Sequence, residues 1–244
     1  MAKSNPTPIV IFDLDGTLID TAPDLVGTLN IVLAEERLPS VALEQARPLI
    51  GAGIRPLIER ALAEQKRNLP TEQVDEMFAR FLGHYQNHIA DLSRPYPGVE
   101  GALDRLADNG LRLAVCTNKY EALSLRLLDA LGLAQRFAAI CGQDTFPMKK
   151  PDPETLRLTI ARAGGDPGQA VMVGDSSTDV ELARAAAVPV VGVDFGYTQT
   201  PMAELAPDRL IGHFDSLPAA VGELLPRIGA MQVKSAAIPV VKAD

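Results

Sequence analysis

The feature that most constrains the fold of this chain is an alternation of short apolar runs with longer segments of helical periodicity. The apolar runs are rich in β-branched residues, end in polar or glycine-containing turns, and span residues 8–12, 111–116, 138–141, 170–173 and 188–193. Helical periodicity follows over residues 98–109, 121–131, 153–163 and 178–187. Because strands that are apolar along their whole length need cover on both faces, the pattern predicts an α/β fold with a doubly wound parallel sheet.

One region breaks this alternation and predicts an insertion. Residues 21–93 contain several amphipathic helical patterns but no convincing strand, as expected for an all-helical cap. The chain returns to the sheet through SRPYPG at residues 93–98, where two prolines stiffen the connection. The predicted units are a discontinuous core of residues 1–20 and 94–230, a helical cap of residues 21–93, and a poorly ordered tail of residues 231–244.

The composition fits a protein with a buried core. Of the 244 residues, 47% are hydrophobic and 22% are charged. No apolar run reaches the roughly 20 residues that a membrane-spanning helix needs, so no membrane span is expected. Residues 1–8 show no apolar stretch followed by a cleavage site, which favours a cytoplasmic protein. Cys116 and Cys141 lie in apolar segments and are predicted to be buried thiols.

The net charge of the chain narrows the range of its partners. A charge of −8 provides no general attraction to nucleic acid or to anionic membranes, because both bind basic patches. We therefore expect neither of these partners, and we expect a monomer or a homodimer. An anionic substrate would need local positive groups that reverse the overall charge.

Two carboxylates stand where the first predicted strand ends. Asp13 and Asp15 belong to the run DLDGT, at the point where the chain leaves the sheet. Neighbouring like charges raise each other's pKa unless a cation offsets the repulsion. A solvated acidic turn would explain so short a run equally well, and its meaning therefore depends on the rest of the sequence.

A second acidic group follows the predicted strand at residues 170–173. Asp175 and Asp179 lie in the run GDSSTD, and ligands of parallel sheets gather at the carboxyl ends of the strands. With Asp13 they could complete an oxygen-rich site of the kind that Mg²⁺ prefers. Asp179 by itself could equally be a residue that the helix dipole favours at a helix start.

Candidate phosphate-binding groups occur at two further places. Thr117 and Asn118 follow the strand at 111–116, and their polar groups could hold a phosphoryl oxygen. By themselves they would be explained equally well as a helix N-cap. Lys150 stands in the run KKPDP, where it could neutralise both a phosphate and a nucleophilic carboxylate. A single lysine would otherwise be a solvated surface charge.

Together these four groups resemble the motifs of the haloacid dehalogenase superfamily, in the same order and each at a strand end. The motifs are DLDGT at residues 13–17, Thr117, Lys150 and GDSSTD at residues 174–179. The resemblance spans nearly the whole chain and implies a Rossmann-like core. The helical insertion is similar to the cap of one branch of the superfamily. Residues 50–54 and 96–99 carry a less specific resemblance to the bacterial phosphoglycolate phosphatases within that branch.

The resemblance implies a phosphatase that forms a phosphoaspartate. Asp13 would attack phosphorus while Mg²⁺, Thr117 and Lys150 stabilise the charge on the phosphoryl oxygens. Asp15 would protonate the leaving alkoxide and then activate the hydrolytic water. Asn118 is expected to assist in binding the phosphate.

The resemblance also implies how the magnesium ion is held. Its expected ligands are the carboxylates of Asp13 and Asp175 and the backbone carbonyl of Asp15. Asp179 is expected to stand behind these groups and to orient either Lys150 or a metal-bound water.

The cap is expected to select the substrate by closing over the site. Gly51 and Gly53 precede the helical pattern at residues 54–62, and a helix N-terminus favours an anion such as a carboxylate. Arg55 could add a charged hydrogen bond to the same group, although an exposed helix arginine would fit the sequence as well. The expected partner is a small phosphorylated metabolite, with 2-phosphoglycolate the first candidate.

The motifs leave the leaving group open. Alternatives within the superfamily are a phosphosugar mutase or phosphatase, a nucleotidase and a pyrophosphatase. A non-catalytic binding scaffold is a further alternative, but it would not need Asp13, Asp15 and Lys150 together. Dehalogenation is disfavoured, because dehalogenases place another residue where this chain has Asp15. Phosphonate cleavage would need a cap lysine at the site, and the polar surroundings of Lys66 predict a surface position.

Overall fold

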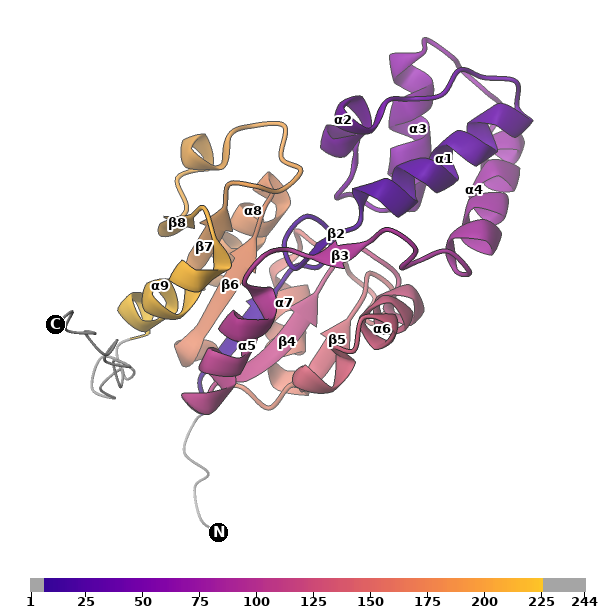
Figure 1. The fold of residues 1–244 in the computed structure, drawn as a ribbon. Helices are drawn as coiled ribbons and strands as arrows, with labels where there is room; N and C mark the ends of the chain where they lie inside the picture. The colour runs from indigo at the N-terminus through magenta and orange to yellow at the C-terminus, as the bar shows by residue number, and fades with distance from the viewer. Residues whose placement is uncertain (1–6, 226–244) are drawn as a thin grey trace, which may run out of the picture.

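The computed structural model describes residues 7–225, which form an α/β core and a group of helices beside it (Figure 1). The core contains a six-stranded sheet in the order β5-β4-β1-β6-β7-β8, in which every neighbouring pair is parallel. Its strands are β1 (Ile9–Phe12), β4 (Arg112–Cys116), β5 (Ala139–Cys141), β6 (Ala170–Gly174), β7 (Val190–Val193) and β8 (Arg209–Ile211). This arrangement confirms the predicted fold class.

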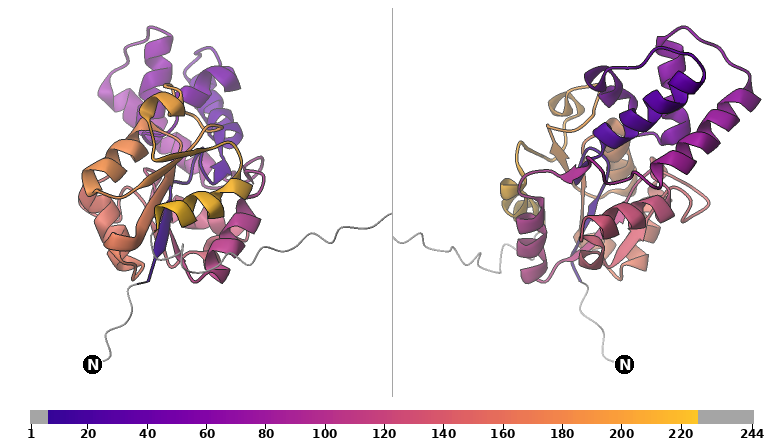
Figure 2. Two further views of the ribbon diagram at one scale, coloured as in Figure 1. Left: turned by 90° about the vertical axis from the view of Figure 1, so that its left-hand side faces the viewer. Right: turned by 45° about the vertical axis from the view of Figure 1, so that its right-hand side comes forward.

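Helices cover both faces of the sheet (Figure 2). Because successive side chains of a strand point to opposite faces, Val10 and Phe12 of β1 join one core cluster and Ile9 and Ile11 join the other. The first cluster includes side chains of α5 (Val99–Asp108), α6 (Glu121–Ala130) and α9 (Leu217–Leu224), and the second those of α7 (Pro153–Arg162) and α8 (Ser177–Ala186). Burial on both sides explains why the central strands read as continuous apolar runs.

The register of the sheet brings its functional edge together. Phe12, the last residue of β1, pairs with Val115 of β4 on one side and with Val173 of β6 on the other. The carboxyl ends of these three strands therefore meet at the same edge. The segments that leave them begin within two residues of that level, so their polar side chains become neighbours.

The helical group contains α1 (Ala22–Glu35), α2 (Leu43–Ala46), α3 (Ile54–Glu64) and α4 (Thr71–Tyr85). Residues 21–93 are all described and form no strand. Leu29, Leu57 and Phe81 are fully or almost fully buried between these helices. Two short antiparallel strands, β2 (Ile19–Asp20) and β3 (Arg94–Pro95), carry the chain between this cap and the core (Figure 1). The predicted boundaries of the cap fall at these two strands.

Several elements escaped prediction because their sequences are short or partly exposed. β8 has only three residues, and Arg209 and Leu210 are exposed at the edge of the sheet. The short helix α2 and the C-terminal helix α9 were also not expected. The tail at residues 231–244 lies outside the described part of the chain. The prediction for the two cysteines is confirmed, because Cys116 and Cys141 are buried free thiols.

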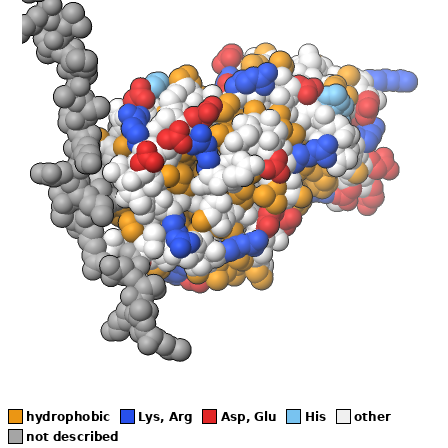
Figure 3. Space-filling view, turned by 60° about the horizontal axis from the view of Figure 1, so that its bottom comes forward, with side chains coloured by type: hydrophobic (Ala, Val, Ile, Leu, Met, Phe, Trp, Pro, Cys, Tyr) orange, Lys and Arg blue, Asp and Glu red, His pale blue; other side chains and the backbone are white. Residues whose placement is uncertain are grey.

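The surface gives no sign of a macromolecular partner on the face that Figure 3 shows. Basic and acidic side chains are interspersed there, without a continuous basic patch (Figure 3). Within residues 7–225, no helix combines the length and the apolar character that a membrane crossing requires.

Candidate active site

Asp13 occupies the buried carboxyl end of β1. Its backbone N–H donates to the carbonyl of Val173 at 2.9 Å, which extends the pairing of β1 with β6 by one residue. The residue is only 5% exposed. Its Oδ1 atom lies 2.9 Å from Lys150 Nζ, yet it accepts no hydrogen bond in favourable geometry. A buried carboxylate oxygen in this state needs a further partner, such as a cation.

Asp175 follows β6 and is held by two donors. The Thr17 hydroxyl donates to its Oδ1 atom at 2.7 Å, and the backbone N–H of Tyr197 donates to its Oδ2 atom at 2.8 Å. A Cβ atom at Gly16 would lie 2.4 Å from Asp175 Oδ2, and one at Gly196 would lie 2.2 Å from Asp175 Cβ. Both positions therefore require glycine, and the close backbone fixes the orientation of the carboxylate.

Lys150 connects Asp13 to Asp179. Its Nζ atom lies 2.7 Å from Asp179 Oδ1, in addition to its contact with Asp13. Asp179 also accepts the backbone N–H and the hydroxyl of Ser176, which completes a capping box at the start of α8. Burial lowers the pKa of Lys150, but the carboxylates of Asp13 and Asp179 outweigh it and raise that pKa overall. Lys150 is therefore an ammonium group, and Asp179 is placed to orient it.

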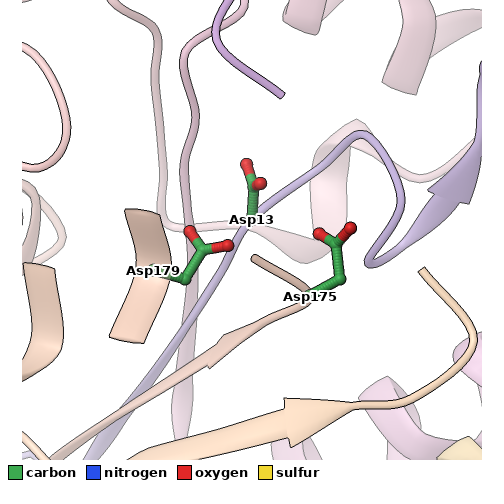
Figure 4. A group of neighbouring side chains, drawn as sticks. All are labelled: Asp13, Asp175 and Asp179. Atoms are coloured by element: carbon green, nitrogen blue, oxygen red, sulfur yellow. The ribbon is translucent and has the colours of Figure 1, made fainter. Parts of the chain in front are cut away.

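Three carboxylates converge at this edge of the sheet. The side chains of Asp13, Asp175 and Asp179 come from different elements and approach one another (Figure 4). An oxygen of each lies within 4.8 Å of the others. Burial, followed by the charges of neighbouring carboxylates, raises the pKa of Asp13 and of Asp175 above the ordinary range. The cluster is therefore short of positive charge.

Thr117 and Asn118 extend this edge beyond β4. The backbone N–H of Thr117 donates to the carbonyl of Cys141 at 3.0 Å. Both residues line a cavity that also contains Asp13 and Asp15. The Oδ1 atom of Asn118 is buried without a hydrogen-bond donor. The structure thus gathers the residues predicted for phosphate binding around Asp13.

Lys119 is a further residue of this cavity, which the sequence reasoning missed. Its Nζ atom lies 3.0 Å from Asp15 Oδ1 and donates to the hydroxyl of Tyr85 at 2.9 Å. Burial lowers the pKa of Lys119, but the charge of Asp15 outweighs it and raises that pKa overall. The available signal was the run TNK, which places a lysine two residues beyond Thr117 at the same strand end.

The charge balance of the site is negative and fits a divalent cation. The two buried ammonium groups are those of Lys119 and Lys150, and the four facing carboxylates are those of Asp13, Asp15, Asp175 and Asp179. With all six groups ionised, the site has an excess of two negative charges. Hard oxygen donors with this deficit fit Mg²⁺.

The glycine-containing loop of the cap lies at the same cavity. Gly51 and Gly53 line it, and their φ angles of 114° and 101° lie in the region that favours glycine. The Asn118 side-chain amide is 3.4 Å from the carbonyl of Gly51. The cap backbone therefore reaches the strand end that carries the predicted phosphate-binding residues.

Arg55 has other partners in this structure. Its guanidinium forms an ion pair with Asp75, lies 3.5 Å from Glu59, and stacks over the ring of Phe78. It lines a neighbouring cavity rather than the one that contains Asp13. Its role in substrate binding stays a prediction, and two cap carboxylates already offset its charge.

A polar network that the sequence reasoning also missed joins the cap to the core. The Tyr197 hydroxyl donates to Asp20 Oδ1 at 2.6 Å and accepts the backbone N–H of Ala22 at 2.9 Å. Arg47 of the cap donates to both oxygens of Asp20, at 3.1 and 3.0 Å. Since Tyr197 also holds Asp175 through its backbone, the network connects the strand β2 to the carboxylate cluster.

The comparison with known proteins agrees with this geometry. The family model of the haloacid dehalogenase-like hydrolases matches residues 10–193. The chain therefore belongs to this family of hydrolases.

Individual relatives are more specific. The chain is 53% identical over 220 residues to a protein of Mesorhizobium japonicum named phosphoglycolate phosphatase, which covers 90% of this chain and 97% of the relative. It is 48% identical to a protein of Agrobacterium fabrum with the same name, over 92% of this chain and 96% of the relative. Among solved structures, a predicted phosphoglycolate phosphatase from Haemophilus somnus has a TM-score of 0.81 at 29% identity, over 88% of this chain and 97% of the other.

Proposed function

We propose that this chain is a Mg²⁺-dependent phosphatase that hydrolyses 2-phosphoglycolate to glycolate and phosphate through a phosphoaspartate on Asp13. The observation that carries the proposal is the buried carboxylate of Asp13 beside Lys150, at the edge where Asp175 and Asp179 converge. A buried nucleophile next to a fixed cation, in a cluster that lacks positive charge, suits transfer of an anionic phosphoryl group. The names of the relatives support the choice of substrate.

The proposed first step is transfer of the phosphoryl group to Asp13. A bond forms between the Asp13 carboxylate and phosphorus while the bond from phosphorus to the ester oxygen breaks. Asp15 donates its proton to the departing oxygen, so the leaving group departs as an alcohol. Lys150, Thr117 and Asn118 hold the phosphoryl oxygens during the transfer.

The second step hydrolyses the acyl phosphate. Asp15, now a carboxylate, accepts a proton from water as the water oxygen attacks phosphorus. The bond between phosphorus and the Asp13 oxygen breaks, which releases phosphate and restores both side chains. A Mg²⁺ ion held by the carboxylates of Asp13 and Asp175 and by the carbonyl of Asp15 would supply positive charge against the phosphoryl oxygens.

A substrate screen tests the proposal. Purified protein with Mg²⁺ is assayed at steady state against 2-phosphoglycolate, sugar phosphates, nucleotides and pyrophosphate. The highest kcat/KM is expected for 2-phosphoglycolate. A higher value for one of the other classes would replace the substrate assignment and leave the phosphatase mechanism, whereas no turnover of any ester would favour the binding scaffold. A cytoplasmic location and a monomeric or homodimeric state stay predictions.

A further inference from the structure

An anionic leaving group meets an unusual distribution of charge in the cavity beside Asp13. Asp13 and Asp15 line the cavity as carboxylates, and Lys119 is the one cationic residue among the described residues that line it. A second carboxylate, brought in by the substrate, would face two negative groups. It can bind stably only where a positive charge offsets this repulsion.

The cap does not supply that charge at this cavity. Its lining residues are apolar side chains and glycines, namely Leu25, Ile50, Gly51, Gly53, Ile54 and Leu57. Arg55 is turned to Asp75 and Glu59 on the cap itself. An apolar wall of this kind lowers the local dielectric, which strengthens the attraction between a carboxylate and an ammonium group inside the cavity.

The position of Lys119 follows from its contact with Asp15. In the proposed mechanism Asp15 protonates the ester oxygen, so the leaving group departs beside Asp15. In a two-carbon hydroxy acid, the carboxylate is attached to the same carbon as that oxygen. The Nζ atom of Lys119 is 3.0 Å from Asp15 Oδ1 and 3.2 Å from Oδ2, so the ammonium stands next to the place where this carboxylate must go.

The side chain of Lys119 is also fixed before substrate arrives. It is 5% exposed, and the buried hydroxyl of Tyr85 at the end of α4 holds its Nζ atom from the cap side. An ammonium group has three N–H donors, which allows it to serve the Tyr85 hydroxyl and a carboxylate together. A bound substrate carboxylate can therefore share Lys119 with Asp15 or take its place.

We infer that Lys119 binds the carboxylate of the leaving group and thereby selects short phosphorylated hydroxy acids over neutral phosphate esters. This inference rests on the proposed function and deepens it. The residue would act on specificity by direct contact with the substrate, in addition to its contact with Asp15.

The test compares two substrates that differ in the carboxylate. Values of kcat/KM for 2-phosphoglycolate and for ethyl phosphate are measured in the wild type, Lys119→Met and Lys119→Arg. Loss of a charged hydrogen bond predicts that Lys119→Met lowers the preference for 2-phosphoglycolate by about 10- to 100-fold, and that Lys119→Arg retains part of it. Lys149→Met is the matched control, because Lys149 is an exposed lysine outside this cavity.

Binding without turnover separates substrate contact from an effect on Asp15. In the Asp13→Asn background, calorimetric titration with Mg²⁺ should show that Lys119→Met weakens the Kd of 2-phosphoglycolate but not that of ethyl phosphate. Equal losses for both esters would overturn the inference and make Lys119 a positioning residue for Asp15. A change of preference in Arg55→Met, with none in Lys119→Met, would assign the carboxylate to Arg55 instead.

Two further measurements keep the outcome clear. Lys119→Met leaves Asp15 buried without its partner, so the titration is repeated with Asp13→Asn/Asp15→Asn and with the same variant carrying Lys119→Met. This pair leaves no uncompensated charge at position 15 and should show the same selective loss. A wild type that does not prefer 2-phosphoglycolate in the broader screen refutes the proposed substrate, whereas a wild type with the preference and a Lys119→Met variant that keeps it refutes only this inference.

Discussion

The ammonium of Lys150 lies 2.9 Å from the Oδ1 atom of Asp13, and both side chains are buried. We expect Lys150→Ala to lower kcat for 2-phosphoglycolate by about 100-fold or more even at saturating Mg²⁺, because a metal on the other carboxylates cannot replace this charge. Circular dichroism should accompany the kinetics, since loss of one partner of a buried ion pair also destabilises the fold. Complete rescue by added Mg²⁺ would show that Lys150 is dispensable, and Lys149→Ala serves as the control.

Asp13→Asn should abolish measurable turnover while the protein stays folded. The substitution nearly conserves volume but removes the carboxylate that would attack phosphorus. Phosphate release is the readout, and the melting temperature checks the fold. A purified variant with activity near that of the wild type would rule out the covalent mechanism.

Asp15→Asn should separate the two chemical steps. An amide cannot protonate the leaving oxygen or activate water, so overall turnover should fall severely. With an aryl phosphate, whose leaving group needs little protonation, phosphoenzyme should still form and accumulate. Intact-mass and peptide mass spectrometry should locate the phosphate on Asp13. Phosphate trapped on another residue would contradict the assignment of the nucleophile.

Removal of divalent metal should inactivate the enzyme. Burial and like charges raise the pKa of Asp13 and Asp175, so the cluster needs a cation to hold both as carboxylates. EDTA should eliminate activity and Mg²⁺ should restore it. Ca²⁺ should substitute poorly, because its larger and more flexible coordination misplaces the nucleophile. Full activity after rigorous chelation would exclude the metal from the mechanism.

Tyr197→Phe should destabilise the protein through the network between β2 and the core. The variant removes the donor to Asp20 and leaves the backbone N–H of Ala22 without its acceptor. The expected cost is about 1 to 3 kcal/mol in the free energy of unfolding, measured by urea denaturation. The backbone N–H of residue 197 still holds Asp175, so metal dependence should stay as in the wild type. Unchanged stability would show that the network contributes little.

Much of the fold and part of the site follow from local sequence patterns. The buried central strands are long apolar runs because both faces of the sheet are covered, and such runs identify themselves without structural information. Parallel strands end at a common edge, so the convergence of Asp13, Thr117 and Asp175 is also predictable. The edge strand β8 was missed because its residues are mostly exposed and leave no apolar run.

The sequence by itself determined the sheet, the inserted helices and the strand ends that carry the carboxylates, because each of these depends on periodicity or on a motif within a few residues. Only the tertiary structure decided the partners of buried charges. The ammonium of Lys119 contacts Asp15, 104 residues away in the chain, and the hydroxyl of Tyr85 in the cap. Arg55 pairs with Asp75 instead of facing Asp13. A buried charge takes the oppositely charged or hydrogen-bonding group that packing brings within reach, and no local pattern encodes that choice.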